Sequence, residues 1–132
     1  MKKMKKVLIV ASGFIGVIVI IASIFWMGLS SNMTKIKNVP IYNLDFTLYN
    51  DGVFEGSYYY EEQIGATVLV EVSNGEVIDI TILEHLAGKG TIAEVITEDI
   101  IRNQTLIVDD ISGATTSSHV LKLAIQDALE EE

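Results

Sequence analysis

The chain has 132 residues, 49% of them hydrophobic, and carries 18 acidic and 9 basic side chains but no cysteine. This length accommodates one small domain and excludes a multidomain enzyme. The lack of cysteine excludes a disulfide scaffold, thiolate metal sites, c-type haem attachment, a lipid anchor on cysteine and a cysteine nucleophile.

An uncharged segment near the N-terminus predicts a membrane anchor. Residues 7–29 are 23 positions without a charged side chain, and four lysines lie before them in residues 1–6. In a helix this segment spans about 34 Å, enough to cross a hydrocarbon core of roughly 30 Å. Because lysine-rich flanks remain cytoplasmic, we expect a cytoplasmic N-terminus, a single transmembrane helix in contact with membrane lipid, and an extracytoplasmic C-terminal domain.

A cleaved signal peptide is the alternative for this segment. Gly28 and Ser30 form a small-x-small pair of the kind that a signal peptidase accepts. The apolar part of a signal peptide, however, spans roughly 7 to 15 residues, and this segment is longer. We therefore expect an uncleaved anchor, and both interpretations export the rest of the chain.

The exported part is strongly acidic. Residues 30–132 contain all 18 acidic residues but only five basic ones, which gives this part a formal charge of −13. Such a charge repels nucleic acid, so we exclude nucleic-acid binding. We attribute the acidity to solubility, because no acidic cluster has the spacing of a metal-binding loop.

The exported part begins with a predicted stalk and continues with a predicted β-sheet. Residues 30–47 are polar and predict an irregular stalk, and the domain is expected over residues 48–132. A first strand is predicted from Val53 to Tyr60. Asn74-Gly75 has the residues of a type I′ turn and predicts a β-hairpin with one buried face. Six residues are expected on that face: Val68, Val70, Val72, Ile78, Ile80 and Ile82.

Two helices are predicted to cover this sheet. Thr91 and Glu94 have the spacing of a capping box, and apolar residues then recur at helical spacing, which predicts a helix over residues 92–103. The last element is an amphipathic helix with an apolar stripe: Val120, Leu121, Ala124, Ile125 and Ala128. The predicted fold class is therefore α+β, a small antiparallel sheet packed by two helices and preceded by one transmembrane helix.

A polar segment directly before the last helix contains the best candidate site. Residues 109–118 read Asp-Asp-Ile-Ser-Gly-Ala-Thr-Thr-Ser-Ser and contain five hydroxyl groups. The unpaired N–H groups and the dipole of a helix N-terminus favour an anion, so the pattern predicts a phosphate-sized site. The alternative is a polar turn in which Ser117 or Ser118 serves only as the N-cap of the helix.

This segment resembles the flavinylation motif of the FMN-binding domain family. The matching residues have the pattern Asp-x-x-Ser-Gly-Ala-Thr and are Asp109, Ser112, Gly113, Ala114 and Thr115. Asp51–Gly56 resembles the opening strand of the family, and the resemblance covers roughly residues 50–129. The domain occurs in the exported flavin-bearing subunits of the sodium-pumping NADH:quinone reductase and of the related ferredoxin-linked complex. There, an FMN transferase esterifies the last threonine of the motif with the phosphate of FMN.

The resemblance implies a cofactor, an attachment site and partners. FMN is expected on Thr115, and Asp109 is expected to take part in recognition by the transferase or its magnesium ion. Ser112, Gly113 and Ala114 are expected FMN contacts. Four further candidate contacts are Thr116, Ser117, Ser118 and His85. The implied partners are FMN transferase and a membrane electron donor or reductase complex. His85 and His119 have no third ligand patterned nearby, so we expect no metal site.

The leading functional hypothesis is an FMN-binding electron carrier rather than an enzyme with its own substrate site, because no nicotinamide site is recognisable. The alternative is a membrane-tethered binding or scaffold module that holds FMN without a covalent bond, or holds no flavin. Tyr58, Tyr59 and Tyr60 are candidates to pack against the flavin ring, but packing within the sheet is the preferred interpretation. His119 is expected in the first turn of the last helix, near the phosphate or in solvent.

Overall fold

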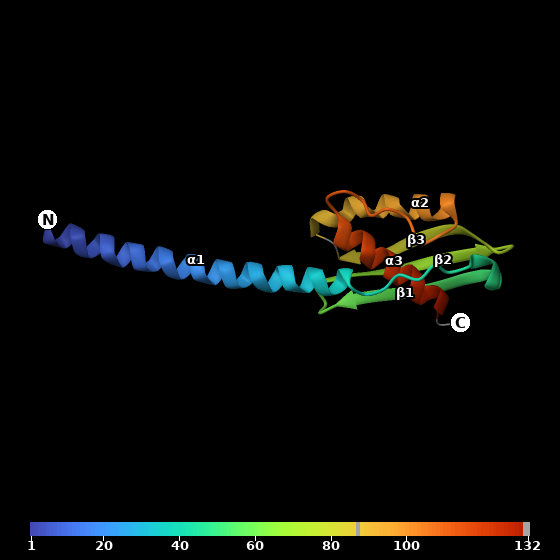
Figure 1. Ribbon diagram of the computed structural model, residues 1–132, viewed down its shortest axis with the longest axis horizontal. Helices are drawn as coiled ribbons and strands as arrows, with labels where there is room; N and C mark the ends of the chain where they lie inside the picture. Colours follow the sequence, from blue (N-terminus) through green and yellow to red (C-terminus); the bar gives the residue numbers. More distant parts are fainter. Residues whose placement is uncertain (87, 131–132) are drawn as a thin grey trace. The chain divides into compact units, whose positions relative to one another are not determined.

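The computed structural model describes residues 1–86 and 88–130, including all of their side chains except those of residues 29–32, 88 and 89. The chain divides into two compact units, Met1–Lys35 and Ile36–Glu132. The second unit is an α+β domain in which a three-stranded antiparallel sheet carries helices, as the sequence predicted (Figure 1).

The N-terminal helix α1 comprises Lys2–Lys37. It is long and apolar enough to cross a membrane, and no residue of its most apolar stretch is buried against the rest of the protein. The irregular stalk predicted over residues 30–47 is wrong for residues 30–37, which are helical. Helix α1 ends shortly before Pro40, because proline has no N–H to donate and disfavours helical geometry at the preceding residue.

The sheet has the strand order β1-β2-β3, formed by Gly52–Tyr60, Ile64–Ser73 and Glu76–Leu86. Asn74 and Gly75 join β2 to β3 with φ angles of 52° and 76°. Because a type I′ turn needs a positive φ at both central positions, the predicted hairpin turn is confirmed.

One residue that was predicted to lie on the buried face of the sheet does not lie there. Val72 pairs with Val77 and Glu71 pairs with Asp79, so Ile78 is an extra residue in β3. This bulge turns Ile78 outward, and 49% of its surface is exposed. The prediction that Ile78 shares the buried face is therefore wrong, because strict alternation of side chains fails at a bulge.

The helical layer comprises a 3-10 segment η2, Gly88–Val95, and two α-helices, α2 at Ile96–Asn103 and α3 at Thr115–Glu130. The predicted helix over residues 92–103 is therefore α-helical only from Ile96. The predicted capping box is not formed at its start, because the Glu94 carboxylate lies 3.1 Å from Nδ1 of His85. Helix α3 packs against β1 and β2, and α2 packs against β3.

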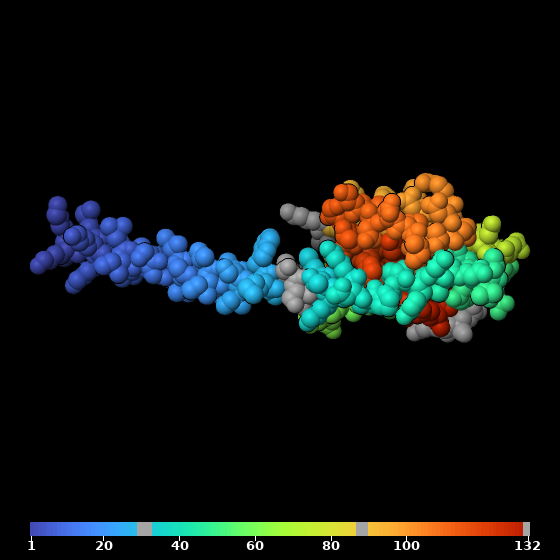
Figure 2. Space-filling model, in the orientation of Figure 1, coloured from blue at the N-terminus to red at the C-terminus, as the bar shows by residue number. Residues whose placement is uncertain are grey.

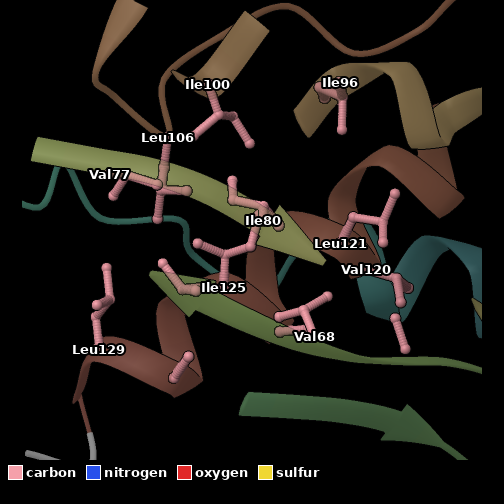
Figure 3. Close-up of a cluster of buried hydrophobic side chains, with 14 of the residues drawn as sticks. Val68, Val77, Ile80, Ile96, Ile100, Leu106, Val120, Leu121, Ile125 and Leu129 are labelled. Carbon is pink, nitrogen blue, oxygen red and sulfur yellow. The ribbon is translucent and has the colours of Figure 1, made fainter. Parts of the chain in front are cut away.

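Helix α3 is buried along most of its length. All five residues of its predicted apolar stripe are buried, and Figure 3 shows Leu121 and Ile125 among side chains from β2, β3 and α2. Lys122 and Gln126 are buried as well. Helix α3 therefore has neighbours on the side away from the sheet, and little of it is visible in Figure 2.

One of these neighbours is the segment that joins α1 to the sheet. The backbone N–H of Tyr42 donates to Oε1 of Gln126 at 2.7 Å, and Nε2 of His119 donates to the Val39 carbonyl at 2.6 Å. Phe46 of this segment is buried in the same core. Residues 39–46 thus lie along α3 (Figure 1), and the domain boundary expected at residue 48 stays a prediction.

Gly56 permits the close packing of α3 on β1. A Cβ atom at this position would lie 2.2 Å from the Ala124 carbonyl oxygen and 2.2 Å from the Ala128 nitrogen. Both neighbours are backbone atoms of α3, so a rotamer change cannot relieve the clash. Only glycine therefore allows the helix to lie this close to the strand.

We predict that Gly56→Ala destabilises the domain by about 1–3 kcal/mol, because α3 must move away from β1 to admit the methyl group. Thermal unfolding followed by circular dichroism measures the loss. Gly52→Ala is the matched control in the same strand, since its Cβ would meet only the Phe54 ring, at 3.4 Å. An equal stability of the two variants would contradict the close packing.

Candidate functional site

A tight turn leads into α3 at the predicted site. The N–H of Ala114 donates to the Ile111 carbonyl at 2.9 Å, and Gly113 between them has a φ of 80°. A positive φ at the third position of a turn favours glycine. A Cβ at Gly113 would meet no atom within 4 Å, so the turn is open to solvent on that side. Glycine is therefore required here for backbone conformation and not for space.

Thr115 is the first residue of α3 and is exposed, as are Ser112 and Gly113 in the turn before it. Ser118 makes the first helical hydrogen bond, from its N–H to the Ala114 carbonyl at 2.9 Å. The N–H groups of Thr115, Thr116 and Ser117 therefore precede the hydrogen-bonded body of the helix. They provide donors for an anion at the positive end of the helix dipole.

Ser118 holds the turn against the helix. Its side chain is fully buried, and its Oγ accepts from the Ile111 N–H at 2.9 Å and donates to the Ala114 carbonyl at 2.8 Å. Because α3 begins at Thr115, neither Ser117 nor Ser118 is its N-cap, and that alternative interpretation is wrong. The hydroxyl of Ser118 points back to the turn, away from solvent.

Two neighbouring aspartates precede the turn and point in different directions. Asp110 forms an ion pair with Lys122, whose Nζ lies 2.9 Å from its Oδ1, whereas Asp109 is exposed. Asp109 also lines an open depression of about 580 Å³ together with Val108 and residues of α2. Sequence reasoning missed Lys122, since a lysine four residues after a serine is unremarkable on an amphipathic helix.

The side chain of His85 is buried at the end of β3, while the residue as a whole is only partly buried. Its side chain is only 2% exposed, and Nδ1 lies 3.1 Å from Oε1 of Glu94 in η2. Because an ionised carboxylate only accepts hydrogen bonds, Nδ1 carries a proton in this contact. Within the described part of the chain Nε2 has no hydrogen-bond partner. This buried ring nitrogen is able to form a hydrogen bond with a ligand.

The three tyrosines of β1 make contacts within the domain. Tyr58 and Tyr60 pack against the hydrophobic core, and burial raises the pKa of Tyr58, with a smaller contribution from Tyr60. The Tyr59 hydroxyl lies 2.7 Å from Thr67 Oγ1 and donates to Glu84 Oε2 at 2.7 Å. The bond to Thr67 lowers the pKa of Tyr59, but desolvation and Glu84 raise it overall. These contacts agree with packing within the sheet.

The start of α3 fits the phosphate of a flavin nucleotide. It offers an exposed hydroxyl on Thr115 and open N–H groups on the first turn of the helix. Exposed apolar side chains of η2, Ile92 and Val95, belong to an element that contacts α3.

We predict that Ser118→Ala destabilises the domain by about 1–3 kcal/mol, because the N–H of Ile111 loses its acceptor in a partly buried site. Ser117→Ala is the control, since Ser117 is also buried but its hydroxyl makes no hydrogen bond with the described residues. Chemical denaturation of both variants measures the difference. A loss of stability in Ser117→Ala as large as that in Ser118→Ala would show that burial of the hydroxyl matters and not the turn.

Comparison with known proteins agrees with this geometry. The family model of the FMN-binding domain matches residues 60–130, which include β2, β3, η2, α2, α3 and the turn before α3. No curated protein and no solved structure gives a significant match. The chain therefore belongs to the FMN-binding domain family, and it is an FMN-binding flavoprotein.

Proposed function

We propose that the chain is a membrane-anchored, extracytoplasmic electron carrier to which FMN is attached through a phosphoester on Thr115. The observation that carries the proposal is the position of this threonine. It is exposed at the first residue of a helix whose body is buried, and a turn with an open glycine precedes it. A hydroxyl in this position is accessible to a modifying enzyme and is held by a rigid element.

Attachment requires an activated flavin nucleotide, in which the FMN phosphate forms a phosphoanhydride with a second nucleotide. Thr115 Oγ1 forms the new bond to phosphorus, the anhydride bond breaks, and the second nucleotide leaves with its phosphate. The threonine proton passes to a base of the partner FMN transferase. The open N–H groups of Thr116 and Ser117 would then stabilise the negative charge of the phosphoester.

Further residues are proposed to hold the cofactor. The hydroxyls of Ser112 and Thr116 flank Thr115, with Gly113, Ala114 and Ser118 shaping the turn, and Asp109 stays exposed for the transferase. His85 offers Nε2 as a hydrogen-bonding group for the cofactor. Bound FMN passes one or two electrons, so the domain accepts electrons from a membrane donor or reductase complex.

We predict that Thr115→Ala abolishes flavin attachment and that Thr116→Ala keeps it. The full chain is co-expressed with an FMN transferase, and the denatured protein is examined by intact mass and in-gel fluorescence. Thr116 is the matched control for the covalent bond, because it is the adjacent threonine in the same helical turn and is proposed to contact the cofactor without forming the ester. Fluorescence retained by denatured Thr115→Ala would refute the assignment. Flavin that all variants lose on denaturation, or a colourless wild-type chain, would favour the binding or scaffold module.

The topology is tested by cysteine labelling, for which the chain is suited because it has no native cysteine. We predict that a membrane-impermeant maleimide labels Glu98→Cys, on the exposed side of α2, in intact cells. Lys3→Cys should react only after the cells are permeabilised. Labelling of Lys3→Cys in intact cells would reverse the predicted orientation, and release of the domain from the membrane fraction would show that the segment is cleaved.

A further inference from the structure

Lys122 is a buried basic residue that the proposed attachment does not use. Its side chain is 8% exposed, and it is the charged member of the four buried polar residues among the side chains that the structure describes. Its Nζ donates to the Val108 carbonyl and to Oδ1 of Asp110. A buried ammonium group is costly unless it is paired and hydrogen-bonded, and both acceptors come from the segment before the turn.

Lys122 acts together with Ser118. The two residues lie four positions apart on α3, so their side chains project from the same face of the helix. Lys122 binds Val108 and Asp110, and Ser118 binds the N–H of Ile111. Side chains of α3 thus bind three residues of the segment that leads to Thr115, namely Val108, Asp110 and Ile111.

The ion pair also gives the two neighbouring aspartates different environments. Asp110 turns toward α3, and its side chain is 29% exposed, whereas Asp109 is exposed beside the depression that it lines. Without the ammonium group, nothing in these contacts distinguishes the two carboxylates. The segment would then lose two of the contacts that hold it against α3, while the hydrogen bonds of Ser118 remain.

We infer that Lys122 is a positioning residue for flavin attachment: by binding Val108 and Asp110 it fixes the segment before Thr115 in the conformation that the transferase recognises. This inference rests on the proposed attachment to Thr115. Lys122 itself does not touch the reacting hydroxyl in this role. Its effect is to raise the fraction of chains that are ready to be modified.

The test uses Lys122→Met, which keeps an apolar stem and removes the ammonium group, in the full chain in detergent with an FMN transferase. The KM for the chain as acceptor should rise about tenfold to a hundredfold, while kcat changes little, because only the competent fraction falls. Lys122→Arg, which restores the charge and the donors, should recover most of the loss. Lys37→Met is the control, since it removes an exposed lysine of the same unit.

Amide hydrogen exchange gives a readout that does not depend on flavin. In the unmodified chain, exchange over residues 108–115 should be about tenfold faster or more in Lys122→Met, while exchange in β2 stays unchanged. Unchanged exchange and an unchanged KM would overturn the inference, as would an equal rise of KM in Lys37→Met. If the wild-type chain accepts no flavin, the proposed function fails, and the exchange measurement alone decides whether Lys122 fixes the segment.

Discussion

Helix α3 is buried against the sheet on one side and against irregular segments on the other, and the rest of the domain depends on this packing. Because residue 56 is glycine, no side chain at this position holds the helix away from β1. On the opposite side, Gln126, His119 and Lys122 bind backbone groups of residues 39–42 and of residue 108. The polar residues of α3 thus hold irregular segments, which have no ladder of their own to satisfy their backbone groups.

Most of the architecture follows from local sequence patterns. Alternation and the Asn74-Gly75 turn predicted the hairpin, and helical spacing predicted the buried stripe of α3. The errors lie where tertiary contacts override local preference. A bulge turns Ile78 outward, and Glu94 binds His85 instead of capping a helix. No local pattern shows that the Glu94 carboxylate will bind a histidine of a strand, nine residues earlier in the chain.

The position of the candidate site was proposed from the sequence, but the contacts that build it were not. Five hydroxyl groups and a glycine before a helix indicated an anion site, and the resemblance singled out Thr115. The roles of the individual hydroxyls required the structure, because Thr115 is exposed while Ser118 is buried only three residues later. This difference arises because successive residues of a helix face different directions. Which residues face the core depends on where α3 begins, and the structure shows that it begins at Thr115. The contacts of Lys122 and of His85 join residues that are distant in sequence.

The position of Thr115 at the start of the most buried helix also determines how far an attached group can travel. Carriers that move a cofactor between distant centres use a long, flexible side chain as a swinging arm. Thr115 has a short β-branched side chain with restricted rotation about χ1, and it stands on an element fixed on nearly every side. On the proposed attachment, the flavin has a short reach, and redox partners must approach the domain closely.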